Sequence, residues 1–407
     1  MGKFAKRHGG KVVGSDSSDR PGWKGPGYIK KADPKPKKMQ KAVVEVEDEE
    51  EVPQHVLPVE LQQLLLGIFK DAFPELIVSD ELKPTLQEVK QALYARDFAR
   101  AFGKDEFLEA YAIRWSPSRA LCYASILVEL RQHLQAISVS GTSGSDGNES
   151  NVSILHAVAF GGGAAEVVAF GGLHRYLRDA SAREDVDEAT AETSDDVAAE
   201  LDALSLATKT ENKTELVLMD TAKWGDVVAR LDKGLSSLPS ISKYASASAK
   251  AAVRSLLPAS DLAATFDCED VLALSPERLE EVIGKRPMLL TLLFTLNELY
   301  TASIAKTTSF LLSMANAVKP GTLLLVVDSP GSYSETTVGK EAKKYPMHFL
   351  LDHTLIGPGK TKDGVAIKPT WEKIVSEDSR WFRLPKDARY PIDLEDMRYQ
   401  LHLYRRL

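Results

Sequence analysis

Apolar runs that end in small or polar residues recur through the second half of the chain. Residues 152–160, 216–219, 287–294 and 323–327 are mostly apolar, and the first of these runs contains several β-branched side chains. Such runs are typical of central strands in a parallel sheet that is covered on both faces. Segments of helical spacing follow several of them. The pattern therefore predicts an α/β fold with a doubly wound sheet, whose ligands bind at the carboxyl ends of the strands.

Two further segments complete the expected sheet. Residues 263–272 fit another strand and its exit, and residues 397–404 alternate between apolar and polar positions up to the end of the chain. Alternation of this kind is typical of a strand. We expect residues 397–404 to form the last strand, with an antiparallel direction as one option.

Residues 58–137 show helical spacing and predict an N-terminal helical region. The Ser- and Gly-rich residues 138–151 predict a flexible linker. The α/β domain then occupies residues 152–407. Within it, residues 179–213 are acidic and poor in aromatic side chains, which predicts a largely disordered surface insertion.

Charge is distributed unevenly along the chain. The net charge is -7, yet residues 1–41 are rich in lysine among glycine and proline, and an acidic run follows at residues 45–51. This composition predicts a disordered tail over residues 1–57. A basic arm indicates a nuclear or nucleolar address or a non-specific phosphate contact, and the alternative is a solvated tail without a partner.

The cysteine count limits the compartment and the chemistry. Cys122 and Cys268 are the two cysteines, too few for a disulfide framework or a cysteine-based zinc site. We therefore expect a reducing compartment and no metal.

The first residues lack the apolar core of a signal peptide, and no apolar run is long enough to span a bilayer. We therefore expect no membrane association.

Gly161, Gly162 and Gly163 follow the strand predicted at residues 152–160, and an Ala-rich segment with Glu166 comes next. A strand, a glycine turn and a helix start form the first half of a nucleotide-type cofactor site, because free N–H groups at the helix start favour an anion. A glycine turn without a ligand is the alternative.

Asp220 ends the next strand, where an acid binds a ribose hydroxyl. The alternative is that Asp220 caps the following helix.

Polar residues follow the other strands at the same predicted edge. Asp267 or Asp270, both within residues 263–272, could bind the exocyclic amine of an adenine. Asp270 is the preferred candidate, and solvated acids in a turn are the alternative. Thr295, Asn297 and Glu298 follow the strand at residues 287–294. The spacing Thr295-x-x-Glu298 also fits a capping box for the next helix, so both functions stay open for Glu298.

Two segments interleave arginine with aromatic residues. In the first, Arg114 and Arg119 flank Trp115 and could hold a phosphate or carboxylate. The second is suited to stacking a splayed nucleic-acid strand, and its members are Arg380, Trp381, Phe382 and Arg383. The alternatives are helix packing for the first segment and a strand edge with solvated arginines for the second.

Six blocks in order resemble the fungal 25S ribosomal RNA uridine-N3 methyltransferase family, from about Tyr94 to the chain end. They are Arg114-Trp-Ser-Pro-Ser-Arg119, Gly161-Gly-Gly-Ala-Ala-Glu166, Phe294-Thr-Leu-Asn-Glu-Leu299, Asp328-Ser-Pro-Gly-Ser-Tyr333, Ser379-Arg-Trp-Phe-Arg383 and Met397-Arg-Tyr-Gln-Leu-His-Leu-Tyr404. The resemblance implies a nucleolar class I methyltransferase that uses S-adenosylmethionine and acts on large-subunit rRNA. Ala165 stands where a third glycine is common in such enzymes, and Ala159 where an acid often precedes the loop.

Residue roles follow from this resemblance. Gly161, Gly163 and Glu166 would hold the methionine end of the cofactor, Asp220 its ribose and Asp270 its adenine, while Asn297 and Glu298 would lie near the transferred methyl group. Uracil must lose its N3 proton, so a base or an electrostatic bias toward the uracil anion is needed. Glu298 is the candidate, Asp328 the second candidate, and Asn297 and Thr295 would position the substrate.

An extruded base would be received by aromatic residues, for which Tyr333, Trp381 and Phe382 are candidates. Methylation at carbon 5 would need a cysteine at the cleft, and neither Cys122 nor Cys268 fits well. We expect a monomer that binds ribosomal RNA or the pre-ribosome. The alternatives are a non-catalytic RNA-binding protein of ribosome assembly and a methyltransferase for a protein or small molecule.

Overall fold

The computed structural model describes residues 56–143, 150–191, 211–240, 244, 246–248, 253–331, 335–338, 343–357 and 369–407. They belong to one compact unit, Pro53–Leu407. Most of the tail predicted at residues 1–57 and the candidate Tyr333 lie outside the described residues.

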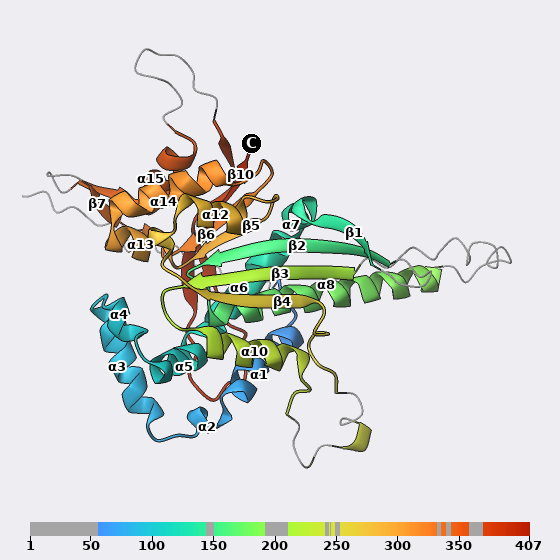
Figure 1. The fold of residues 1–407 in the computed structure, drawn as a ribbon. Helices are drawn as coiled ribbons and strands as arrows, with labels where there is room; N and C mark the ends of the chain where they lie inside the picture. Colours follow the sequence, from blue (N-terminus) through green and yellow to red (C-terminus); the bar gives the residue numbers. More distant parts are fainter. Residues whose placement is uncertain are drawn as a thin grey trace, which may run out of the picture. The chain divides into compact units, whose positions relative to one another are not determined.

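A single large sheet organises the described chain (Figure 1). Its strand order is β4-β3-β2-β5-β6-β10-β9. The first five of these strands are parallel, and β10 runs antiparallel to both β6 and β9. This confirms the doubly wound sheet and the antiparallel option for the last strand. The strands are β2 (Ser150–Phe160), β3 (Glu211–Asp220), β4 (Leu262–Cys268), β5 (Leu289–Leu293), β6 (Leu323–Asp328), β9 (Trp371–Phe382) and β10 (Met397–Arg406).

The order of the strands also locates the ligand edge. The chain proceeds outward from β2 to β3 and β4, then returns to the other side of β2 with β5 and β6. In sheets of this kind, ligands bind where the order reverses, beyond the carboxyl ends of the strands. That point lies between the ends of β2 and β5.

Helices cover both faces of the sheet. One face carries α1 (Val59–Ala72), α3 (Leu82–Tyr94), α5 (Asp105–Arg114), α6 (Ser116–Glu129), α7 (Arg131–Ile137), α8 (Ala164–Ala191) and α10 (Gly225–Ser236). The other carries α12 (Pro276–Ile283), α13 (Leu296–Ala302), α14 (Ile304–Ala317) and α15 (Met347–Leu355). The short elements are α2 (Pro74–Ile77), α4 (Phe98–Ala101), η1 (Val271–Ala273), β7 (Glu335–Val338) and β8 (Lys343–Pro346).

Alternation along the strands produces two cores. Leu323, Leu325 and Val327 of β6 pack in the core that contains α6 and α8, whereas Leu324 and Val326 pack in the core that contains α14 and α15. Successive side chains of a strand point to opposite faces, so a strand covered on both faces needs apolar residues at every position. This is why the central strands are continuously apolar in sequence.

The segment predicted as a linker at residues 138–151 is partly a strand. β1 (Val139–Ser143) pairs antiparallel with the first half of β2, from Val139 opposite Ile154 to Ser143 opposite Ser150. The pairing has a simple reason: β5 pairs with β2 only at Ala157–Ala159, which leaves the earlier edge of β2 for another strand. The flexible linker was therefore wrong for residues 139–143.

The predicted acidic insertion at residues 179–213 is also shorter than expected. Helix α8 continues to Ala191, and β3 begins at Glu211, while residues 192–210 lie outside the described part. Ala, Glu and Arg favour a helix, and Arg175 pairs with Asp179 one turn away at 2.9 Å. The helix therefore extends beyond the part that packs on the sheet.

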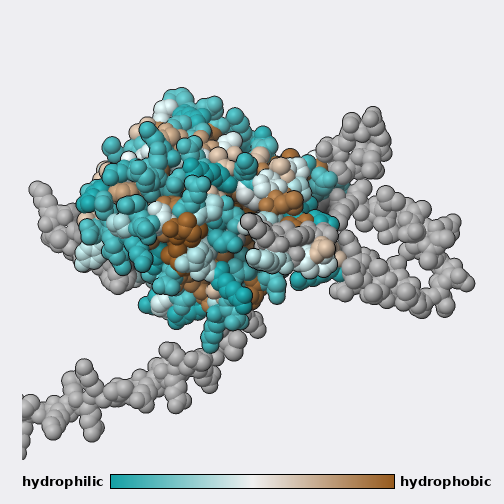
Figure 2. All heavy atoms as spheres, turned by 90° about the horizontal axis from the view of Figure 1, so that it is seen from below, coloured by the Kyte–Doolittle hydropathy of each residue, from teal (hydrophilic) through white to brown (hydrophobic). Residues whose placement is uncertain are grey.

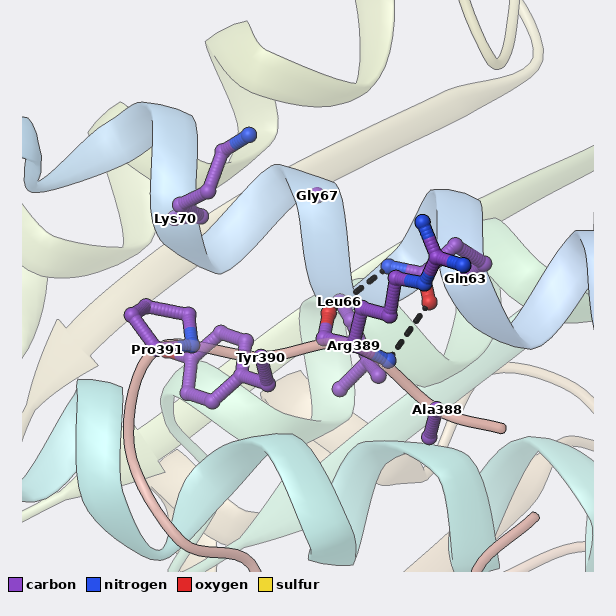
Figure 3. A pocket seen from close by; sticks show the side chains of 8 residues that line it. All are labelled: Gln63, Leu66, Gly67, Lys70, Ala388, Arg389, Tyr390 and Pro391. Carbon is purple, nitrogen blue, oxygen red and sulfur yellow. Dashed lines mark hydrogen bonds between the residues drawn. The ribbon is translucent and has the colours of Figure 1, made fainter. Parts of the chain in front are cut away.

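The N-terminal helices do not form a separate body. Helix α6 packs along α8, and α1 packs on α8 and α10. The segment Ala388–Pro391 also crosses α1 and borders a surface hollow (Figure 3). There the side chain of Gln63 accepts a hydrogen bond from the N–H of Arg389 at 2.8 Å and donates one to its carbonyl at 2.9 Å. This contact joins the first helix to the connection that precedes β10.

The surface offers no broad apolar band on the face shown in Figure 2, where hydrophobic residues gather in small groups on a largely hydrophilic background. Among the described helices, none combines the length and apolar character that crossing a bilayer requires.

Candidate active site

The glycine turn between β2 and α8 is held by close contacts on three sides. Gly161 has φ +72°, and a Cβ there would lie 2.3 Å from Thr295 Oγ1. A Cβ on Gly162 would lie 2.6 Å from Ala159 Cβ, and one on Gly163 would lie 3.0 Å from the Trp224 ring. The turn therefore needs glycine at Gly161 for both its backbone angle and its space. Gly162 serves packing against the strand.

Helix α8 begins directly after this turn. The carboxylate of Glu166 accepts a hydrogen bond from the N–H of Gly163 at 2.8 Å. Glu166 is buried, and burial raises its pKa to about 7, although the backbone N–H bonds act in the opposite direction. The Glu166 carboxylate thus holds the glycine turn in place, and the same group can exchange a proton near neutral pH.

Asp220 closes β3 at the same edge. Its Oδ1 accepts the N–H of Ala222 at 2.7 Å, whereas the residue before helix α10 is Trp224, which makes no side-chain cap. The helix-cap alternative for Asp220 is therefore wrong. Burial raises the pKa of Asp220 to about 6. A hydroxyl group that donated a hydrogen bond to this carboxylate would stabilise its ionised form.

The exit of β5 is strained. Phe294 has φ +58°, which is costly for a residue with an aromatic side chain. Its N–H donates to the carbonyl of Val327 at 2.7 Å, which fixes the turn against β6. The Thr295 hydroxyl donates to the Leu293 carbonyl and makes no cap on α13. The predicted capping box is therefore not formed, and Glu298 is not held by it.

Glu298 is half-buried on α13 and has no hydrogen-bond or ion-pair partner within the described residues. Burial raises its pKa to about 8; Asp328 and Asp220 add to the rise, and Arg119 opposes it. A carboxyl group with a pKa near neutral can accept a proton at physiological pH and release it again.

Asp328 ends β6 and behaves differently. It is buried, and its two oxygens accept the N–H groups of Asn297 at 3.0 Å and Ser329 at 2.7 Å. Burial raises its pKa to about 6 against these hydrogen bonds. Asp328 thus anchors the start of α13, which carries both Asn297 and Glu298.

These elements enclose one cavity, which α5 and α6 close from the N-terminal side. Of the predicted residues, it is lined by Gly161, Gly163, Glu166, Asp220, Thr295, Glu298 and Arg119. Gly162, Asp270, Asn297 and Asp328 do not line it. The prediction missed further lining residues, most of them aromatic: Phe102, Tyr111, Ser116, Tyr123, Trp224 and Phe294. Tyr111, Ser116 and Tyr123 lie in helices whose spacing is that of ordinary packing, whereas Phe102, Trp224 and Phe294 lie just outside the ends of helices and strands.

The family model described as "Putative SAM-dependent methyltransferase" matches residues 69–405 of this chain. The chain belongs to this methyltransferase family. A relative in Saccharomyces cerevisiae, the 25S rRNA (uridine(2843)-N(3))-methyltransferase, is 31% identical over 351 residues, which is 84% of this chain and 85% of the relative. The resemblance noted from the sequence is confirmed.

Solved structures of other methyltransferases are also similar. A protein from Nostoc punctiforme that is described as a "putative O-methyltransferase" has a TM-score of 0.35 and 11% identity, covering 83% of this chain and 71% of that one. The N-methyltransferase NodS from Bradyrhizobium japonicum, in complex with S-adenosylhomocysteine, has a TM-score of 0.31 and 10% identity, covering 79% and 98%. Because both scores are low, the fold assignment rests on the strand order and the family match.

The methyltransferase cavity fits S-adenosylmethionine, the family's cofactor. The glycine turn leaves a cradle that side chains would fill, and Asp220 stands where a ribose hydroxyl is bound in such sheets. Glu166 and Glu298 are acidic groups that suit an ammonium and a sulfonium. The cavity thus presents acids toward a predominantly cationic ligand.

Asp270 lies elsewhere in the methyltransferase. Its carboxylate accepts the N–H of Leu272 at 2.9 Å and caps the short helix η1. The neighbouring acids Asp267 and Glu269 both pair with Arg278. The adenine role of Asp270 stays a prediction.

Most of the predicted RNA-binding arginines already have acidic partners. Arg114 pairs with Glu395, Arg380 makes two bonds of 2.6 Å to Glu129, and Arg383 pairs with Asp396 at 2.9 Å. Phe382 is buried in the core because neighbours on a strand face opposite sides. Stacking of RNA on Phe382 therefore has no structural support.

Trp381 is the exposed member of this segment, at 50% exposure. The guanidinium carbon of Arg383 lies 4.1 Å from its ring centroid, and that of Arg398 lies 5.8 Å away. In the other segment, Trp115 packs at 5.3 Å from Tyr111 and borders a second hollow together with Arg119 and Phe294. Trp115 and Trp381 thus remain candidates for nucleotide contact.

One group in the described residues has metal-ligand chemistry: His348, Asp378 and His402 place ligand atoms within 4.8 Å of one another. Both ring nitrogens of His402 are already engaged, Nδ1 with Ser376 at 3.0 Å and Nε2 with Gln400 at 3.1 Å. A metal would have to break these bonds.

Proposed function

We propose that this chain methylates N3 of a uridine in large-subunit ribosomal RNA. The 31% identity to the yeast uridine-N3 methyltransferase over 84% of the chain carries the proposal. The unpaired Glu298 at the cofactor cavity supports it, because methylation at N3 requires removal of a proton.

Glu298 is the proposed base. When bound, S-adenosylmethionine supplies an electrophilic methyl group on a sulfonium centre. The uracil N3–H is weakly acidic, so a carboxylate with a pKa near 8 accepts its proton more readily than an ordinary glutamate does. Positive charge in the cavity favours the ionised form of Glu298 at neutral pH.

Asp328 and Thr295 take supporting roles in this proposal. Asp328 bonds the backbone of Asn297 and so fixes the first turn of α13. Thr295 packs against the glycine turn and sets the distance between the ends of β2 and β5. In-line displacement depends on such positioning. Asn297, which lies in this first turn, is the candidate for orienting the uracil.

N3 lies on the Watson–Crick edge, so the target uridine must be unpaired or extruded. Trp381 and Trp115 offer exposed or half-buried aromatic surfaces for this purpose. Methylation at carbon 5 is disfavoured, because Cys122 is buried in α6 and Cys268 lies at the end of β4, and neither lines the cavity.

The proposal extends to place and partners. An enzyme for large-subunit rRNA works in the nucleus and nucleolus on pre-ribosomes, and the lysine-rich residues 1–41 suit a nuclear address and phosphate contact. We propose that the enzyme acts there as a monomer.

The test is a map of N3-methyluridine in rRNA from cells that lack this protein. We expect one site to disappear, to return with the wild-type gene, and to stay absent with Glu298→Gln. The exposed Glu280→Gln serves as matched control and should restore the site. An unchanged map in the deletion strain would refute the proposal. Calorimetry without detectable S-adenosylmethionine binding would instead favour a non-catalytic assembly protein.

A further inference from the structure

Arg119 occupies a position in the cavity that its sequence motif did not indicate. It lies in the first turn of α6, and its guanidinium carbon is 4.9 Å from the Phe294 ring centroid and 5.4 Å from that of Tyr111. It shares the cavity wall with Gly163 and Glu166. Arg119 therefore borders the cofactor cavity as well as the second hollow beside Trp115. The motif Arg114–Arg119 alone left phosphate or carboxylate binding and helix packing open.

Arg119 also differs from the other arginines of the two motifs in its partners. Arg114, Arg380 and Arg383 each pair with a carboxylate. In the part of the chain that the structure describes, no carboxylate lies within ion-pair distance of Arg119. Its contacts are aromatic faces, which leave the N–H donors available.

The side chain keeps its charge in this setting. Burial lowers the pKa of Arg119, but Tyr111, Tyr123, Glu298 and Glu166 act in the opposite direction, and the net pKa is raised. A half-buried guanidinium without an anionic partner loses hydration that nothing in the described protein replaces. Such a group gains most from an anion that enters the cavity.

The cofactor contains one such anion. S-adenosylmethionine carries a sulfonium, an ammonium and a carboxylate, and the carboxylate is its only negative group. The cavity lining has three acids, Glu166, Asp220 and Glu298, and one cation, Arg119. Matching these charges assigns the acids to the cationic groups and the hydroxyls of the ligand, and Arg119 to its anion.

We propose that Arg119 binds the methionine carboxylate of S-adenosylmethionine. Helix α6 would then complete the cofactor site from the N-terminal side, opposite the glycine turn. The inference rests on the cofactor assignment and is independent of which nucleotide is methylated. The planar fork of arginine suits a carboxylate, because two parallel N–H donors meet its two oxygens.

The test compares S-adenosylmethionine with its decarboxylated form, using calorimetry on the full chain. For Arg119→Gln, we expect affinity for S-adenosylmethionine to fall about 10- to 100-fold, the range of a charged hydrogen bond. Affinity for the decarboxylated form should stay within about twofold. Arg119→Lys should fall between, since it keeps the charge and loses the fork.

Retained binding of the decarboxylated form shows that the variant is folded. Arg383→Gln is the matched control, since Arg383 lies outside the cavity and should change neither affinity. Equal losses for both ligands, or no loss for either, would overturn the proposal. A loss of RNA affinity with unchanged cofactor affinity would assign Arg119 to a phosphate instead. The product identity, measured separately on rRNA, tests the proposed function alone.

Discussion

The cofactor cavity and the β9–β10 hairpin contain similar residues in opposite states. In the hairpin, Arg380 and Arg383 are paired with acids, and the aromatic Phe382 is buried as core. In the cavity, Arg119 and Glu298 have no ionic partner among the described residues, and Phe294 is strained. The two regions therefore differ less in their residue types than in whether their charged side chains have ion-pair partners.

This contrast has an energetic basis. Exposed ion pairs such as Arg383–Asp396 contribute about 0–1 kcal/mol each, so they order the hairpin without dominating it. Unpaired charges and a backbone in the left-handed region lower stability instead. Their concentration at one cavity is expected where a ligand supplies the missing partners.

Replacing the proposed base should separate the two regions most sharply. We expect Glu298→Gln to lower kcat about 10²- to 10⁴-fold, the usual contribution of general base catalysis. Cofactor affinity should fall less than kcat, because Gln keeps the shape of the side chain and removes only its charge. Transfer of a labelled methyl group to rRNA from the deletion strain measures the rate. A loss below about threefold would exclude Glu298 as the base.

The glycine turn should be the next most sensitive position. Gly161→Ala places a Cβ 2.3 Å from Thr295 Oγ1 and in a left-handed backbone. We expect a loss of about 1–3 kcal/mol in stability and weaker cofactor binding. Urea unfolding and calorimetry measure the two effects.

Gly67→Ala is the matched control, because no atom lies within 4 Å of its Cβ position on α1. It should stabilise the protein by about 0.5–1 kcal/mol, since alanine favours a helix over glycine. Equal responses of the two variants would contradict the close packing at Gly161.

Trp381 tests the hairpin side. If its exposed ring receives a nucleotide, Trp381→Ala should weaken RNA binding by about 1 kcal/mol, or roughly fivefold, the lower end for one stacked base. Cofactor affinity should not change. Filter binding with an rRNA fragment measures the loss. Tyr94→Ala, which removes an exposed aromatic on α3, is the control; an equal loss there would indicate a non-specific effect.

The last prediction concerns the pH dependence of stability. The pKa of Glu298 rises from the ordinary value near 4.5 to about 8 in the folded state. Between these values the folded protein holds a proton that the unfolded chain has released, so a rise in pH destabilises the fold. Glu298→Gln removes this dependence.

The variant should therefore become more stable than the wild type as pH rises from about 5 to about 9. Thermal unfolding without cofactor measures the difference in Tm. A difference that stays constant over this range would show that Glu298 titrates normally in the folded protein.

The sheet and its ligand edge could be predicted because both follow from local pattern. Continuous apolar runs identified the central strands, and small or acidic residues at their ends identified Gly161, Gly163, Asp220 and Glu298 as neighbours. Parallel strands bring such ends together whatever lies between them in sequence.

The helical wall of the cavity could not be predicted in the same way. Tyr111 and Tyr123 lie on helices whose spacing looks like ordinary packing, and only tertiary contact turns them toward the glycine turn. The acidic partners of Arg114 and Arg380 lie hundreds of positions away in the sequence, so the sequence pattern does not reveal them. The same pattern does not reveal that Arg119 has no such partner among the described residues. The prediction of a flexible linker at residues 139–143 was wrong for a similar reason, because β1 forms by pairing with the open edge of β2.

One wall of the donor pocket belongs to α5 and α6, far upstream of the glycine turn, and Gln63 ties α1 to the connection before β10. The N-terminal layer is consequently no detachable module: a chain trimmed to start at β2 would open the pocket to water. Saturation with the methyl donor should slow amide hydrogen exchange in α5 and α6 together with the turn, so that folding of the helical layer and loading of the enzyme are thermodynamically linked.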